Sequence, residues 1–170
     1  MAQPPPRTVP ATALDFATDA YAGVHARPGK GLPHARAVAG LLVDDGADDT
    51  TVAAALLHDV VEDTPCTVED VRAQFGDQIA DMVAALTEDR SIKRYAQRKR
   101  TLRSRIAAAE PAVMDIAVAD KVASLRDAAR TASSISRRKL SHYRATLRLA
   151  QAAGASAGLV EELDRLLAHG

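Results

Sequence analysis

The stretch Ala53-Ala54-Ala55-Leu56-Leu57-His58-Asp59-Val60-Val61-Glu62-Asp63-Thr64 constrains the fold of this chain more than any other. Apart from its terminal Thr64, it is apolar except for four side chains: His58, Asp59, Glu62 and Asp63. On a continuous α-helix each residue advances by about 100°, so the imidazole and the three carboxylates fall within an arc of about 140°. The opposite face can pack on a core. The polar face gathers three like charges, and their burial needs a cation or hydrogen bonds to compensate it.

Composition places the chain among globular proteins. Its 170 residues are 47% hydrophobic and 26% charged, which allows one domain with a sizeable core. Lys plus Arg and Asp plus Glu both number 22, and aromatic residues make up only 3% with no Trp. A balanced charge and few stacking side chains argue against a nucleic-acid partner.

The sequence also bounds compartment and domain organisation. Cys66 is the only cysteine, so no intrachain disulfide can form, and no run is long and apolar enough for a membrane span. The N-terminus lacks the apolar centre of a signal peptide, so we expect a cytoplasmic protein that does not bind membranes. Four prolines among the first ten residues predict a disordered tail over 1–11, followed by a single domain over 12–170.

Helical signals follow one another along the chain, and no run reads as a strand. Thr67-Val68-Glu69-Asp70 resembles a capping box, and either Asp48 or Asp49 could cap the helix that carries the central stretch to Asp63. Proline and glycine residues separate the segments. The sequence therefore predicts an all-α fold with helices over about 12–25, 34–45, 49–63, 68–75, 77–87, 91–109, 112–132, 136–153 and 156–168.

Two further residues extend the polar face into a possible metal site. His34 opens a helix directly after a loop rich in Pro and Gly, and Asp120 interrupts the apolar run Met114–Val122. With His58 and Asp59 they form a mixed nitrogen and oxygen set. Such a set suits Mn²⁺, Fe²⁺, Co²⁺ or Zn²⁺ better than Ca²⁺ or Mg²⁺. Water on such an ion becomes a nucleophile at neutral pH.

The order His34, then His58-Asp59, then Asp120 resembles that of the HD-domain metal-dependent phosphohydrolases. The segment 56–64 is closely similar to the central motif of the RelA/SpoT-type hydrolases within that family. The segments 34–39 and 118–127 resemble the family's first-histidine and last-aspartate motifs. The similarity spans about residues 21–150, which is most of the chain.

This resemblance implies a compact helical HD fold that binds one Mn²⁺ and hydrolyses the 3′-diphosphate of the nucleotide (p)ppGpp, giving GDP or GTP and pyrophosphate. It implies two sets of residues. The metal ligands are His34, His58, Asp59 and Asp120. The catalytic acids that orient or deprotonate the attacking water are Glu62 and Asp63.

Substrate contacts follow from the same resemblance, with departures. Ser124 stands where many members have Asn, Ala35 follows the first histidine in place of Pro, and the family's Arg-Lys pair is reduced to Arg27 and Lys30. The expected substrate-binding residues are Arg27, Lys30, Ser124, Arg98, Lys99 and Tyr143. For the other histidines, His25, His142 and His169, surface or packing roles are favoured.

Two alternatives stay open at this point. The same metal centre could cleave another nucleotide, such as the 2′-phosphate of NADPH or a nucleoside monophosphate, which would release orthophosphate instead of pyrophosphate. The chain could also be a non-catalytic HD module that binds a nucleotide. The sequence predicts no oligomeric state.

Overall fold

The structure, a computed structural model, describes residues 8–25 and 29–168, and these residues form helices with no strand. The all-α prediction is confirmed. The helices are α1 (Val9–Tyr21), α2 (Leu32–Asp44), α3 (Asp49–Leu57), α4 (Val60–Asp63), α5 (Val68–Phe75), α6 (Asp77–Leu86), α7 (Tyr95–Ala108), α8 (Pro111–Arg130), α9 (Arg137–Ala153) and α10 (Ala157–Ala168).

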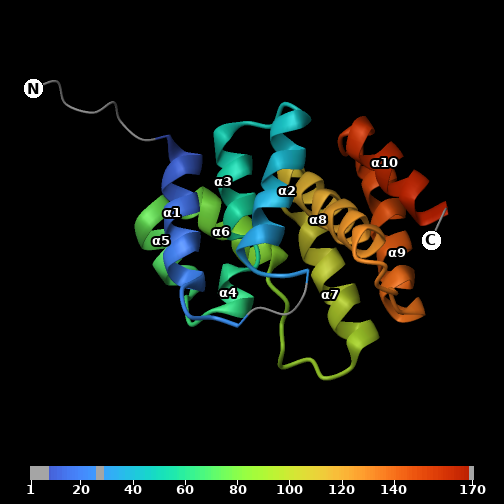
Figure 1. Cartoon of the computed structure of the whole chain (residues 1–170), viewed down its shortest axis with the longest axis horizontal. Coiled ribbons are helices and arrows are strands. Elements are labelled where there is room, and N and C mark those ends of the chain that lie inside the picture. Colours follow the sequence, from blue (N-terminus) through green and yellow to red (C-terminus); the bar gives the residue numbers. More distant parts are fainter. Residues whose placement is uncertain (1–7, 26–28, 169–170) are drawn as a thin grey trace, which may run out of the picture.

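Helices α3 and α8 form the centre of the fold. Every residue of α3 from Thr51 to Leu57 is buried, as expected for a helix that is apolar all round. Helix α3 packs against α1, α2 and α6, while α8 packs against α2, α9 and α10. Figure 1 shows the consequence: α1 and α5 lie at one end of the molecule and α9 and α10 at the other. The polar residues that interrupt α3 and α8 are therefore held near the middle of the molecule.

Local capping explains where several helices begin and end. The Asp48 side chain accepts a hydrogen bond from the amide of Thr51 at 2.8 Å, so Asp48 is the N-cap of α3. The predicted capping box is present, because Thr67 and Asp70 each accept a hydrogen bond from the other's backbone amide. Gly154 ends α9 in the left-handed conformation, at φ 69°, which glycine adopts without strain.

Asp48→Ala is expected to lower the free energy of unfolding by about 1 kcal/mol, because the Thr51 amide loses its acceptor. Hydrogen bonds from Thr51 hold the pKa of Asp48 below its ordinary value. This stabilisation is therefore present above the unfolded-state pKa and is lost as pH falls through the folded-state pKa. Urea unfolding at pH 7 and at acid pH measures both effects, with Asp48→Asn as a control that retains the cap. Equal stability of Asp48→Ala and wild type at pH 7 would contradict the assignment.

The predicted boundary of the N-terminal tail is wrong. Helix α1 begins at Val9 and ends at Tyr21, whereas the sequence predicted a tail over 1–11 and a helix over 12–25. Thr8 caps this helix, and Pro10 lies in its first turn, where a missing backbone N–H breaks no helical hydrogen bond. Residues 1–7 lie outside the described residues.

The central stretch is not one continuous helix, which corrects the expectation of a helix to Asp63. Helix α3 ends at Leu57, and the short α4 begins at Val60. In a continuous helix the carbonyl of Ala55 would accept from the amide of Asp59. Here the ring of His58 lies against that carbonyl, with Nδ1 2.7 Å from Ala55 O. Asp59 adopts φ −102° and ψ −4°, so the chain turns between the two helices.

The basic helix begins later than predicted, at Tyr95 instead of residue 91. Asp89 accepts hydrogen bonds from both the amide and the hydroxyl of Ser91, which fixes a turn in place of the first helical turn. Arg98, in the first turn of α7, donates to the carbonyl of Ile92 at 2.8 Å and so ties the preceding loop to the helix. This loop, residues 87–94, lies beside the site described below.

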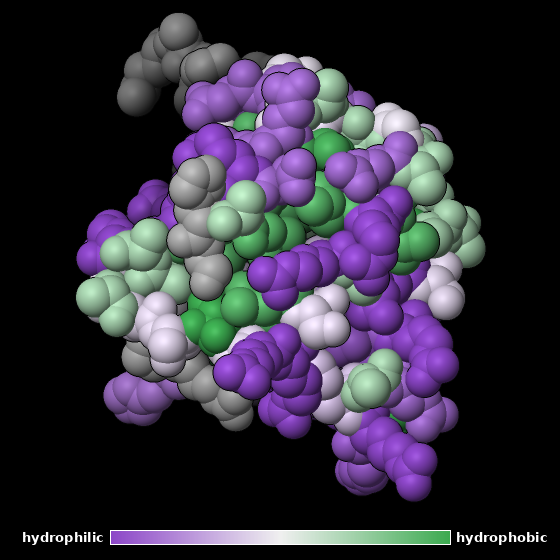
Figure 2. Space-filling model, turned by 90° about the vertical axis from the view of Figure 1, so that its right-hand side faces the viewer, coloured by the Kyte–Doolittle hydropathy of each residue, from purple (hydrophilic) through white to green (hydrophobic). Residues whose placement is uncertain are grey.

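Hydrophilic side chains cover much of the face that Figure 2 shows, around a smaller apolar band. Within the described ranges, no helix combines the length and the hydropathy that crossing a bilayer requires.

Candidate metal centre and active site

Three side chains that are distant in sequence converge between α2, α3 and α8. They are His34, in the first turn of α2, His58, directly after α3, and Asp120, in the middle of α8. One possible ligand atom from each lies within 4.8 Å of the others. His34 Nε2 is 2.9 Å from Asp120 Oδ1, across 86 residues of sequence.

His58 has the orientation of a metal ligand. Its Nδ1 faces the carbonyl of Ala55, so in the neutral imidazole the proton sits on Nδ1 and is donated there, which leaves the lone pair on Nε2 for a metal. His58 is only 3% exposed, and its Nε2 has no hydrogen-bond partner among the described residues. The nearest carboxylate oxygen, Asp59 Oδ2, is 3.5 Å away, which is too long for a good hydrogen bond. A buried nitrogen of this kind, beside a second imidazole and a carboxylate, fits a divalent transition metal.

Asp59 lies at the edge of this group. Its Oδ2 contacts Lys30 Nζ at 2.6 Å, and Asp59 is 8% exposed. Lys30, expected to contact substrate, therefore pairs with a predicted metal ligand in this structure. The structure brings three of the four predicted ligands within one small volume and places the fourth beside it.

The charges around His58 and Asp120 favour a positive charge between these side chains. Burial opposes protonation of His58, but Asp59 and Asp120 outweigh it and raise the pKa of His58 to about 9. Burial also opposes ionisation of Asp120, yet Lys121 and His34 hold the pKa of Asp120 well below its ordinary value. Lys121 Nζ is 2.7 Å from Asp120 Oδ2, so Oδ1 is the oxygen directed at His34.

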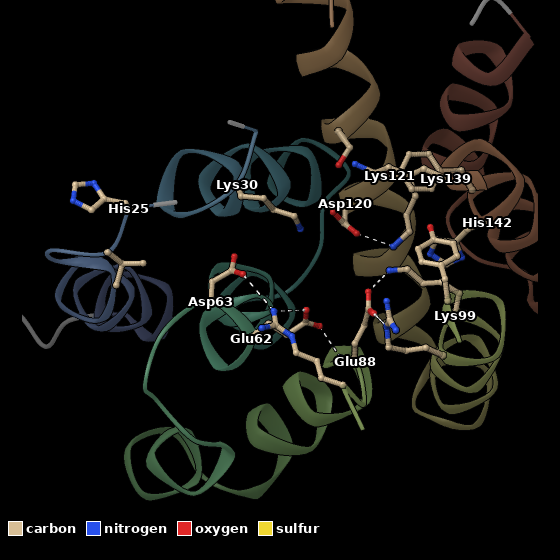
Figure 3. Close-up of a pocket in the computed structure, with 16 residues that line it drawn as sticks. His25, Lys30, Glu62, Asp63, Glu88, Lys99, Asp120, Lys121, Lys139 and His142 are labelled. Atoms are coloured by element: carbon tan, nitrogen blue, oxygen red, sulfur yellow. Dashed lines mark hydrogen bonds and ion pairs between the residues drawn. The ribbon is translucent and has the colours of Figure 1, made fainter. Parts of the chain in front are cut away.

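A cavity of about 770 Å³ opens in front of this group. Figure 3 shows Glu62 and Asp63 on one side of it and Lys99, Lys121 and Lys139 on the other, with Lys30 and Asp120 between them. The carboxylates lie beside the metal group, our name for His34, His58 and Asp120, and the cations lie across the cavity. Such a site can hold a polyanion and accept a proton.

Glu62 and Asp63 are both poised to bind protons. Burial raises the pKa of Glu62, and the charges of Asp59 and Glu88 add to this, while a hydrogen bond from the Glu88 amide opposes it. Burial, and then Asp59, also raise the pKa of Asp63. Arg90 Nη2 lies 3.6 Å from Glu62 Oε2 and 3.9 Å from Asp63 Oδ1. A carboxylate whose pKa is shifted toward neutrality is better suited to general base catalysis.

The predicted substrate-binding residues have mixed placements. Ser124, Tyr143, Arg98 and Lys99 all line the cavity, as does Lys30. Arg98 and Lys99 are not free cations, because Arg98 Nε lies 2.6 Å from Glu88 Oε2 and Lys99 contacts Glu88 Oε1. Arg27 lies outside the described residues.

Several cavity residues were missed by the sequence reasoning. They are Glu88, Arg90, Lys121, Lys139 and His142. Of the surface or packing roles expected for His142, the surface role is excluded: His142 is 5% exposed, and its Nδ1 accepts from Arg103 at 2.8 Å. Lys121 and Glu88 carried a usable signal, since Lys121 adjoins Asp120 and Glu88 directly follows the predicted helix over 77–87. No local signal pointed to His142 or Lys139.

The candidate ligands come from α2, from the end of α3 and from α8, and a histidine and an aspartate are adjacent at the centre. A family model described as "HD domain" matches residues 13–148. The chain belongs to the HD-domain family. This HD domain is 41% identical over 98 residues to the "Probable GTP pyrophosphokinase" of Mycobacterium leprae, covering 56% of this chain and 12% of that protein.

Shorter proteins are similar over more of their length. The human "Guanosine-3′,5′-bis(diphosphate) 3′-pyrophosphohydrolase MESH1" is 32% identical to this HD domain over 120 residues. The matched part is 68% of this chain and 66% of MESH1. A solved structure described as a metazoan ortholog of SpoT that hydrolyzes ppGpp has a TM-score of 0.78 at 27% identity, covering 96% of each chain. The chain thus spans a small fraction of the Mycobacterium leprae relative and just under two thirds of MESH1.

Proposed function

We propose that this protein hydrolyses the 3′-diphosphate of (p)ppGpp, releasing pyrophosphate and leaving GDP or GTP. The observation that carries the proposal is the convergence of His34, His58 and Asp120 beside a cavity that holds Glu62 and a row of cations. The names of the similar proteins, among them the human 3′-pyrophosphohydrolase, support this substrate over other nucleotides.

We propose Mn²⁺ as the metal, held by His34, His58, Asp59 and Asp120. The Nε2 of His58, which no described residue pairs, and the mixed nitrogen and oxygen donors support a transition metal at this position. When bound, a divalent ion supplies acidified water and offsets negative charge on the phosphoryl oxygens.

Two carboxylates of the chain would then accept a proton from the attacking water and orient that water. Glu62 accepts the proton of the attacking water through Oε2, because Oε1 already accepts from the Glu88 amide at 2.7 Å. Asp63 orients the same water from the adjacent position. The new bond joins the water oxygen to the phosphorus on the 3′ oxygen, and the bond from the 3′ oxygen to that phosphorus breaks. Pyrophosphate leaves, and the 3′ oxygen takes up a proton to become the 3′ hydroxyl.

The cations across the cavity would bind the substrate. Lys139 and Lys99 line the wall opposite Glu62. Ser124, on α8, and Tyr143, on α9, line the same cavity. Lysine ammonium groups offset phosphate charge, and a hydroxyl can donate to a sugar oxygen. We propose that this wall holds the nucleotide so that its 3′-diphosphate faces the metal group.

Product analysis tests the proposal. The purified chain is incubated with Mn²⁺ and with ppGpp, pppGpp, NADPH or nucleoside monophosphates, and both pyrophosphate and orthophosphate are measured. The proposal predicts pyrophosphate from ppGpp and pppGpp. Orthophosphate from NADPH or a monophosphate as the main product would contradict it in favour of another HD phosphohydrolase reaction. No product from any of these would favour a non-catalytic module.

A further inference from the structure

One peptide group connects Glu62 to a distant arginine. The amide of Glu88 donates to Glu62 Oε1 at 2.7 Å. The carbonyl of the same peptide group, Thr87 O, accepts a hydrogen bond from Arg105 Nη2. Arg105 lies in the last turn of α7, 18 residues beyond Thr87. The guanidinium and the carboxylate therefore bind opposite ends of a single planar unit.

The peptide group is held firmly in this position. Thr87 is the C-cap of α6, and both its amide and its hydroxyl donate to the carbonyl of Val83, at 3.0 and 2.8 Å. The side chain of Glu88 is tied to α7 by its ion pairs with Arg98 and Lys99. Helix α7 thus fixes residue 88 through its side chain and the preceding carbonyl through Arg105.

Arg105 is half-buried beside this peptide group, and its charge also acts on Asp89. Its Nε is buried and has no hydrogen-bond partner among the described residues. A partly buried guanidinium that donates to a carbonyl polarises the peptide, and hydrogen bonds arranged in a chain strengthen one another. The Glu88 amide therefore becomes a stronger donor to Glu62 than an isolated amide would be.

We propose that Arg105 is a positioning residue for Glu62 and acts through the Thr87–Glu88 peptide group. The inference rests on the proposed function, in which Glu62 receives the proton of the attacking water. Fixing Oε1 leaves Oε2, 3.6 Å from Arg90 Nη2, as the oxygen that can accept this proton. A small displacement of a catalytic group costs rate, with little effect on substrate binding.

A merely structural role for Arg105 makes a different prediction. A cation near the C-terminus of α6 stabilises the carbonyls at that end of the helix. Loss of such a contact would lower the melting temperature but would leave kcat and the Glu88 hydrogen bond unchanged.

The experiment compares Arg105→Met, which removes the donors, with Arg105→Lys, which keeps a cation. Arg100→Met is the matched control, because Arg100 is exposed on the same helix and does not line the cavity. We expect kcat of Arg105→Met to fall on the order of tenfold with KM nearly unchanged, and Arg105→Lys to restore part of the loss. Arg105→Gln takes the place of Arg105→Met if that variant does not fold.

A second readout does not depend on turnover. The amide proton of Glu88, measured by NMR in the full chain, should lie far downfield in the wild type and move upfield in both Arg105→Met and Glu62→Gln. The proposal is overturned if both the Glu88 shift and kcat of Arg105→Met match those of Arg100→Met. If the wild type releases no pyrophosphate, the proposed function fails, and the Glu88 shift still decides whether Arg105 acts on Glu62.

Discussion

Glu62→Gln is expected to lower the rate of pyrophosphate release by a factor between about 10² and 10⁴, the range that general base catalysis supplies. Glutamine has nearly the same shape, and its side-chain oxygen can still accept from the Glu88 amide. It cannot accept the proton of the attacking water. Metal affinity should stay close to that of the wild type, because Glu62 is outside the group formed by His34, His58 and Asp120.

Steady-state kinetics and a Mn²⁺ titration of the same preparations measure the two effects. The matched control is Glu161→Gln, an exposed glutamate on α10 that does not line the cavity. It should behave as the wild type does. A Glu62→Gln variant with the kcat of this control would refute the assigned role.

Asp120→Asn is expected to abolish measurable turnover and to weaken Mn²⁺ binding by about 100-fold or more, since metal ligands contribute more than the supporting residues around them. Asp120 lies between His34 Nε2 and Lys121 Nζ. The amide of asparagine is neutral and can accept through only one of its two polar atoms. It therefore leaves one neighbour unpaired and removes the anion that attracts the metal.

Isothermal titration calorimetry measures the loss of Mn²⁺ affinity. Circular dichroism melts measure how much stability the protein loses when Lys121 is left without its partner carboxylate. Asp164→Asn, on the exposed face of α10, is the control. Wild-type metal affinity in Asp120→Asn would show that α8 supplies no ligand.

The parts of the fold that local chemistry determines could be predicted from the sequence. The N-cap of α3, narrowed from the sequence to Asp48 or Asp49, the capping box at Thr67 and the glycine that ends α9 depend on residues within one helical turn of each other. The convergence of His34, His58 and Asp120 depends on long-range packing, and the resemblance to a family supplied what periodicity alone could not.

The remaining features depend on tertiary contacts that no sequence window contains. The turn at His58 and Asp59 is an exception: its contact between the imidazole and the Ala55 carbonyl is local, but helical periodicity assumes an unbroken hydrogen-bond ladder and so misses it. His142 faces the cavity only because α9 packs on α8 and α7. The Glu88 amide reaches Glu62 across 26 residues of sequence.

The most direct test is a crystal structure with Mn²⁺, with anomalous diffraction collected at the manganese edge. We expect one anomalous peak within bonding distance of His34 Nε2, His58 Nε2 and a carboxylate oxygen of Asp120, with the carboxylate of Asp59 turned from Lys30 to the ion. A peak bound elsewhere, or one that leaves His34 and Asp120 in contact only with each other, would contradict it.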